Sequence, residues 1–343
     1  IAPNGISQLK LENEEYEPYY DLLFQSTIFD DSIHFELNKQ SPEGMVFIPQ
    51  TACTYIAEAA ASSLRLVGLE ASPYMEITDF FMDKYEVTNK QYQSFVDAGG
   101  YSNPEYWAFP FQEENRSFNF QEAMALFIDK TGRPGPASWE VGSYPEGTED
   151  FPVNGISWFE AAAYATYVGK SLPSVYHWDR AALTWGSSEI ILTANLNSKS
   201  LKPVGNSINR FGVYDLAGNV REWSYNPARD EQRFILGGGW NDFAYGFNDA
   251  YAQSPFDRSI TNGFRCIKQL YKRENDSIFS MQLNVPDRDF YSEPRISEDA
   301  YQSYLTQFQY DKTDLDIVID SVSESDEWIR QRVEFNAAYG NER

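Results

Sequence analysis

Cysteine and histidine are the side chains best suited to binding soft or borderline metals, and this 343-residue chain has only two of each. Cys53 and Cys266 are too few for a disulfide framework or a cysteine-based zinc site. His34 and His177 cannot supply a three-histidine iron or zinc centre from this chain alone. These counts exclude whole classes of metalloenzyme.

The chain is strongly acidic. Aspartate and glutamate outnumber lysine and arginine by 51 to 27, a formal net charge of −24. Such a charge repels nucleic-acid phosphates, so we expect no nucleic-acid partner. No apolar run approaches the roughly 20 residues of a membrane span, and the N-terminus lacks the pattern of a signal peptide. We expect a soluble segment without membrane insertion. Its compartment stays unknown, and a membrane-tethered parent stays open.

Three helices are predicted in the middle of the chain. A Thr-x-x-Gln capping box opens residues 88–99, and a Ser-x-x-Glu box opens residues 157–169. Both segments end at a glycine. A third, short helix follows Ser174. The rest of this region is rich in Trp, Tyr, Gly and Pro, which favours irregular loops held by aromatic packing.

Tryptophans and a glycine run define the expected core. Trp158, Trp178 and Trp223 are predicted to fill it. The run at 237–239 would let the backbone approach closely beside Trp240.

The two ends of the chain differ from the middle. Residues 1–42 alternate apolar and polar stretches, which predicts a few strands belonging to the end of an upstream β-module. Residues 271–343 begin as a charged linker and continue with a helix capped by Ser297. Two strands are then predicted, LDIVID and RVEFNA, on either side of an acidic segment.

Six motifs occur in a fixed order between about Gly44 and Ile267. They are GMVFIPQ, DFFMDKYEVTNKQYQSFV, PVNGISWFEAAAYATYVGKSLPSVYHWDRAA, FGVYDLAGNVREW, RFILGGGWND and NGFRC. Together they resemble the formylglycine-generating-enzyme or sulfatase-modifying-factor family. The resemblance implies an α+β, C-type-lectin-like fold with little regular secondary structure. This domain would span residues 43–270, flanked by the N-terminal β segment and the C-terminal extension of a helix and strands.

The resemblance also indicates what is missing. Copper-dependent members place two cysteines just after the glycine-rich strand, and here Asp242 and Phe247 fall at those positions. Neither side chain can hold Cu(I) as a thiolate pair does, so no copper is expected. Cys266 is predicted to be a buried free thiol, because its usual family partner is replaced by Ala165, and Cys53 is interpreted in the same way.

A calcium site is implied at the turn YDLAGNVREW. The family ligands there correspond to Asp215, Gly218, Val220 and Glu222, and carboxylates with carbonyls on one tight turn are the hard oxygen ligands that Ca²⁺ prefers. The alternative is that both carboxylates pair with nearby backbone groups or with Arg221 or Arg265. A second family site, beginning at a position that resembles Asn195, lacks its acidic loop here.

Three functions remain open. The first is a recognition or scaffolding domain that binds a peptide, a small molecule or a neighbouring domain of the same polypeptide. The second is an enzyme of altered chemistry, for which the candidate catalytic residues are Asp242, His177, Tyr245 and Arg258. A lone histidine among aromatic residues is more often a hydrogen-bonded core residue.

The third function is an accessory domain of a fused hydrolase. Segments such as TGRPGPASWEVGSYPEG and SPFDRSITNGFRC resemble large bacterial fusion proteins, in which a signalling module precedes the domain and an α/β-hydrolase follows. The segment 271–343 would then be a linker and the start of the hydrolase-associated region.

Overall fold

The computed structural model describes most of the chain, in two compact units, Ile1–Pro286 and Asp287–Arg343. The described residues are 6–13, 16–24, 41–49, 64–113, 116–182, 188–209, 211–270, 277–286, 291–308 and 314–336, and of 6–24 only the backbone. Helices and strands both contribute to the first unit, so the predicted α+β class is confirmed.

Short sheets make up the strand part of the first unit. A four-stranded sheet has the order β10 (Asn262–Gly263), β7 (Arg221–Pro227), β8 (Arg233–Leu236) and β9 (Ala252–Gln253), in which only β10 and β7 run parallel. An antiparallel three-stranded sheet has the order β11 (Ile267–Gln269), β4 (Phe80–Asp83) and β3 (Met45–Ile48). Two hairpins are formed by β1 (Ile6–Asn13) with β2 (Tyr16–Phe24), and by β5 (Phe111–Glu113) with β6 (Arg116–Phe118).

The helices of the first unit are short. They are α2 (Asn89–Asp97), α3 (Phe120–Met124), α4 (Trp158–Tyr167), α5 (Val175–Ala182), α6 (Ser188–Ile191) and α7 (Ser277–Ser280), with 3₁₀ turns η1 (Pro104–Tyr106) and η2 (Ala244–Phe247). The three predicted helices correspond to α2, α4 and α5. Both predicted capping boxes are present, and α3 opens with a further box, Asn119 with Glu122.

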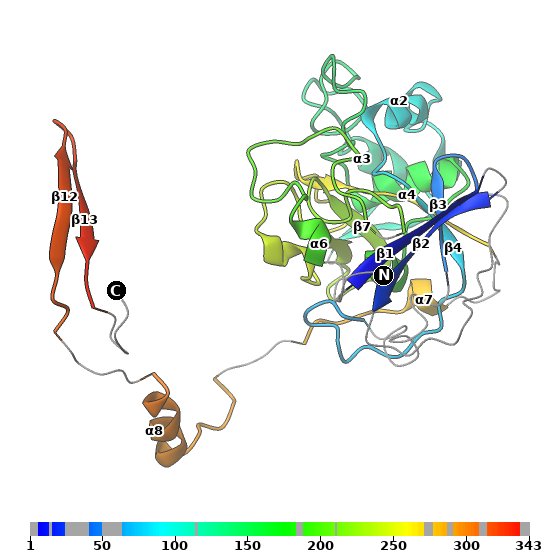
Figure 1. Ribbon diagram of the computed structural model, residues 1–343. Helices are drawn as coiled ribbons and strands as arrows, with labels where there is room; N and C mark the ends of the chain where they lie inside the picture. The colour runs from blue at the N-terminus through cyan, green and yellow to red at the C-terminus, as the bar shows by residue number, and fades with distance from the viewer. Residues whose placement is uncertain are drawn as a thin grey trace. The chain divides into compact units, whose positions relative to one another are not determined.

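Strand β7 lies inside the first unit (Figure 1) and contacts α4, α5 and α7 as well as its sheet neighbours. Because it is covered on both faces, all seven residues of this strand are half-buried or buried, without a polar-out alternation. Trp158, Trp178 and Trp223 are each 0% exposed, which confirms their predicted role in the core. Their indole N–H groups donate to a carbonyl, a carboxylate and a carbonyl respectively, so each of these three buried indoles has an acceptor.

The first unit continues past residue 270, the end predicted for the family domain. Ile278 and Leu283 are buried in its core, and the Asn226 side chain donates to the carbonyl of Ile278. The segment 277–286 therefore packs as part of this unit.

The second unit has a helix and a hairpin, as the sequence predicts. Helix α8 (Glu298–Thr306) is capped by Ser297, and β12 (Val318–Glu324) pairs with β13 (Ile329–Glu334). The hairpin turn is tighter than expected, because part of the acidic segment continues β12 instead of forming the connection. The described side chains of α8, β12 and β13 are all exposed or half-buried.

Gly218 occupies a crowded left-handed position that admits no side chain. Its φ is +80°, and a Cβ there would lie 2.5 Å from the carbonyl oxygen of Asn195. Gly147 has nearly the same φ, +79°, but open space around it. We expect Gly147→Ala to cost about 1–2 kcal/mol, the left-handed penalty alone. Gly218→Ala should cost about 1–3 kcal/mol more, because overpacking is added.

Urea unfolding of both variants measures this difference. Equal losses in the two variants would show that the close approach to Asn195 contributes nothing.

Candidate functional site

Asp242 stands where the family resemblance places a catalytic cysteine, and its carboxylate is occupied by protein donors. The Arg221 guanidinium donates to both oxygens, at 2.7 and 2.8 Å, and the Gly239 backbone N–H donates at 2.6 Å. Partial burial raises the pKa of Asp242, but the hydrogen bonds from Arg221 and Gly239 outweigh it, so the pKa is lowered overall. A carboxylate held in this way is a poor proton acceptor near neutral pH.

Exposed aromatic rings lie beside this ion pair. Phe243 and Tyr245 follow it on the same loop, are 57% and 68% exposed, and stack with ring centroids 5.9 Å apart. Tyr251, 46% exposed, lies under the Arg221 guanidinium at 4.3 Å. We call Arg221, Asp242, Phe243, Tyr245 and Tyr251 the aromatic patch.

The other residues relevant to copper chemistry are buried or undescribed. Phe247, at the second cysteine position, is 0% exposed and packs edge-on against Trp178. Cys266 is a buried free thiol, as predicted, and burial raises its pKa well above the usual value. Such a thiol is a weak nucleophile and a weak metal ligand at neutral pH. Cys53 lies outside the described residues.

His177 and Arg258 do not join Asp242. His177 is 2% exposed, its Nδ1 lies 2.6 Å from the Ser174 hydroxyl, and burial lowers its pKa to about 3. Arg258 forms a two-point ion pair with buried Glu160 and also donates to three backbone carbonyls. Each of these candidates therefore has its own partners, and His177 has those of a neutral core residue.

The Asp215 carboxylate satisfies backbone donors in a neighbouring loop. It accepts from the N–H groups of Gly205, Asn206 and Ser207, and the last two bonds are each 3.0 Å long. Asp215 is 1% exposed and has a φ of +56°, an uncommon conformation for a non-glycine residue. The loop hydrogen bonds account for this geometry.

Glu222 forms a buried, two-point ion pair with Arg265. The guanidinium donates to the two carboxylate oxygens at 2.6 and 2.8 Å, and the Trp178 indole adds a third bond at 2.9 Å. Arg265 also donates to the carbonyls of Tyr214 and Asp83. Both side chains are almost fully buried, at 0% and 1% exposure. A paired and hydrogen-bonded arrangement is what burial of such charges requires.

Glu86 is a buried acid that the sequence analysis missed. It is 1% exposed and accepts from the side chain of Asn219 and from the backbone of Val220. Burial raises its pKa well above the usual value, and the nearby Asp215 and Glu222 add to this effect. In the sequence it stands in the DKYEVTN segment, where a single glutamate before a helix gives no sign of burial.

The carboxylates of the calcium turn thus contact backbone groups and Arg265, which is the predicted alternative to a calcium site. As arranged, they do not fit calcium, because Arg265 already neutralises Glu222 and the Asp215 oxygens serve three donors. Within the described residues, no three His, Cys, Asp or Glu side chains could together hold a metal ion. Asn195, the start of the second family site, has a buried Oδ1 without a hydrogen-bond partner, but one oxygen is far from the six to eight of a calcium shell.

The fold and the site define a loop-rich α+β domain of short helices and sheets, with a charged core and an ion pair near the surface at Asp242. A model of the sulfatase-modifying factor enzyme 1-like domain matches residues 32–270. The chain belongs to this sulfatase-modifying-factor family, as its motifs indicate.

Curated relatives differ in their functions. Hercynine oxygenase of Mycolicibacterium smegmatis is 25% identical over 57% of this chain and 46% of its own length. Inactive C-alpha-formylglycine-generating enzyme 2 of Mus musculus is 28% identical over 60% of this chain and 80% of its own. Serine/threonine-protein kinase pkn1 of Chlamydia caviae is 29% identical over 55% of this chain and 33% of its own length. The chain spans less than half the length of three hercynine oxygenases that it matches, at 46%, 45% and 44%.

Solved structures match more remotely. CarF has a TM-score of 0.43 and 16% identity over 67% of this chain and 99% of its own. PvdO from Pseudomonas aeruginosa has a TM-score of 0.43 and 18% identity over 66% of this chain and 94% of its own.

Breaking the buried pair should be costly. We expect Glu222→Gln to lower the free energy of unfolding by about 3–5 kcal/mol, because Arg265 then keeps a buried charge without its carboxylate. The matched control is Glu140→Gln, which removes an exposed pair with Lys130 and should cost less than about 1 kcal/mol. Equilibrium unfolding in urea measures both, and similar small losses would contradict the importance of the buried pair.

Calcium should leave the thermal stability unchanged. Because the turn carboxylates already have protein donors, we expect millimolar calcium added to the EDTA-treated protein to shift Tm by less than about 1 °C. Differential scanning calorimetry measures this shift. A saturable rise that disappears in Asp215→Asn would instead establish the calcium site that the family resemblance implies.

Proposed function

We propose that this domain recognises a ligand or a neighbouring protein segment and does not oxidise cysteine. The observation that carries the proposal is the ion pair of Asp242 with Arg221 at the position of the family's metal-binding thiol. A carboxylate that already serves a guanidinium and a backbone N–H cannot replace a thiolate as a Cu(I) ligand.

The relatives support a loss of this chemistry within the family. One of them is described as an inactive formylglycine-generating enzyme, and this chain covers 80% of it. Another is a kinase of which the match spans only 33%, which fits a module within a larger protein. The name hercynine oxygenase argues for retained oxygen chemistry, but this chain has only two histidines for an iron centre.

The aromatic patch is the surface we propose for recognition. Aromatic side chains supply large contact area at low entropic cost, and arginine is favoured at binding surfaces. One exposed ring under the Arg221 guanidinium and two on the loop that follows Asp242 fit a peptide or a neighbouring domain of the same polypeptide better than a water-excluding catalytic pocket. No helix in the described part of the chain is long and apolar enough to cross a membrane.

The other two functions are less well supported. An enzyme of altered chemistry needs Asp242, His177 and Arg258 to share a site, whereas their partners differ. The fused-hydrolase context and the assignment of residues 1–42 and 271–343 to flanking modules stay predictions.

A copper and activity assay tests the proposal. We expect the purified chain to bind no stoichiometric Cu(I) in competition with a chelating dye. We also expect no conversion, by mass spectrometry, of a cysteine-containing sulfatase-motif peptide with copper and oxygen supplied. The physical reason is that Cys266 is buried with a raised pKa and Asp242 is occupied.

Variants Cys53→Ser and Cys266→Ser complete the design. Copper binding and peptide conversion that both disappear in either variant would overturn the proposal, because they would reveal a working thiol site.

A further inference from the structure

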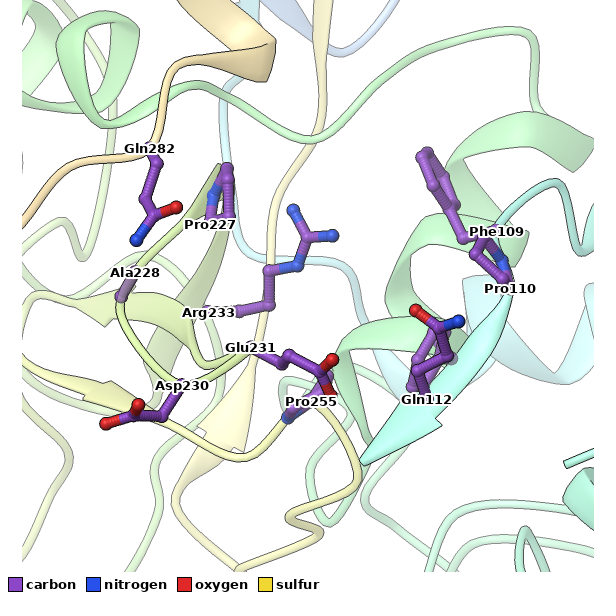
Figure 2. A pocket seen from close by; sticks show the side chains of 11 residues that line it. Phe109, Pro110, Gln112, Pro227, Ala228, Asp230, Glu231, Arg233, Pro255 and Gln282 are labelled. Carbon is purple, nitrogen blue, oxygen red and sulfur yellow. The ribbon is translucent and has the colours of Figure 1, made fainter. Parts of the chain in front are cut away.

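A pocket of about 360 Å³ lies beside the β7–β8 hairpin, and none of its lining residues belongs to the aromatic patch. Figure 2 shows Arg233, Glu231 and Asp230 on the hairpin side, with Phe109, Pro110 and Gln112 on the other. Its volume is at the lower end of the range for small-molecule sites.

Arg233 brings a positive charge to this pocket. Its guanidinium lies 4.0 Å over the Trp158 ring and donates one hydrogen bond, at 2.7 Å, to the Tyr225 carbonyl. No carboxylate pairs with it among the described residues, and burial lowers its pKa to about 10. Because a guanidinium has five N–H donors, several remain available for a ligand.

The turn that directly precedes Arg233 in the chain is strained. Ala228 and Gln232 are hydrogen-bonded across it, and the two residues at its tip, Asp230 and Glu231, have φ values of +51° and +59°. Two-residue turns of this kind favour Asn-Gly, since each non-glycine residue in this conformation costs of order 1 kcal/mol. The strained pair puts two carboxylates at the pocket, and strain of this kind is common at ligand sites.

The two charges indicate what would bind. A simple anion would be attracted by Arg233 and repelled by Glu231 and Asp230. A simple cation would be attracted by the two carboxylates and repelled by Arg233. A molecule with both charges satisfies both ends, and the rings of Phe109 and Phe159 would cover its apolar middle. We propose that this pocket binds a small zwitterion of the basic amino acid kind, with its carboxylate on Arg233 and the ammonium group at the far end of its apolar chain toward Glu231 and Asp230.

This site does not depend on the proposed function of the domain, because none of its lining residues belongs to the aromatic patch. A free basic amino acid and the C-terminal basic residue of a peptide carry the same two groups, so both are tested.

Matched probes are titrated into the whole chain, and binding is measured by the NMR shift of the Trp158 indole N–H. We expect saturable shifts with L-lysine. Lysinamide, which lacks the carboxylate, and norleucine, which lacks the side-chain ammonium, should each bind about tenfold more weakly or worse. Gly-Lys binding as well as lysine would identify a peptide end, and weaker binding would identify a free amino acid. Failure of lysine to bind, or equal binding of lysine and lysinamide, would overturn the proposal.

Variants separate a ligand role from a structural one. Arg233→Gln should weaken lysine binding at least tenfold, whereas Arg233→Lys keeps the charge and should keep part of the affinity. The matched control Arg229→Gln removes the same charge from the same hairpin outside the pocket and should leave binding unchanged.

Replacing Asp230 and Glu231 by Asn and Gly gives the sharpest result. Asn-Gly suits the turn, so the double variant should unfold at a higher temperature while losing the preference for lysine over norleucine. An increase in stability with that preference intact would contradict a binding role for the two carboxylates.

Discussion

The buried pair between Arg265 and Glu222 is the interaction on which the rest of the domain depends. Arg265 contacts Glu222 on β7 and the carbonyls of Asp83 and Tyr214, so one guanidinium connects three segments far apart in sequence. Trp178 of α5 adds a donor to the same carboxylate. Removing any one of these groups would leave a polar atom unpaired in a fully buried place, which is why the arrangement acts as a unit.

Strand alternation connects this buried pair with the surface. Glu222 and its neighbour Arg221 point to opposite faces of β7, because successive side chains on a strand do so. Glu222 therefore reaches the core pair, while Arg221 reaches Asp242 beside the exposed aromatic rings. The position of the patch thus follows from the register of one strand. Arg233, on the next strand, is held instead by Trp158 and the Tyr225 carbonyl, which places it at the other site.

The sequence predicts the parts of this structure that have local signals. Capping boxes mark α2 and α4 because the cap and the third helical residue are both visible in the sequence. The same signal marks α3, a helix that was not predicted. The buried state of Cys266 and of the core tryptophans follows from residue type. Long-range pairing does not: Arg265 is 43 residues from Glu222, and Glu86 is 133 from Asn219. No local pattern indicates with which of several acidic residues a buried arginine forms an ion pair.

The two ion pairs of β7 differ in how strongly they constrain the fold. The Arg265–Glu222 pair is buried, so its loss exposes an uncompensated charge to a low-dielectric interior and costs several kcal/mol. The Arg221–Asp242 pair is about one-fifth exposed at each side chain and is screened by solvent, so its contribution to stability is small. Residue 242 can therefore be replaced with little effect on the fold. Stability constrains the core charges of β7 and leaves the loop at residue 242 free to vary.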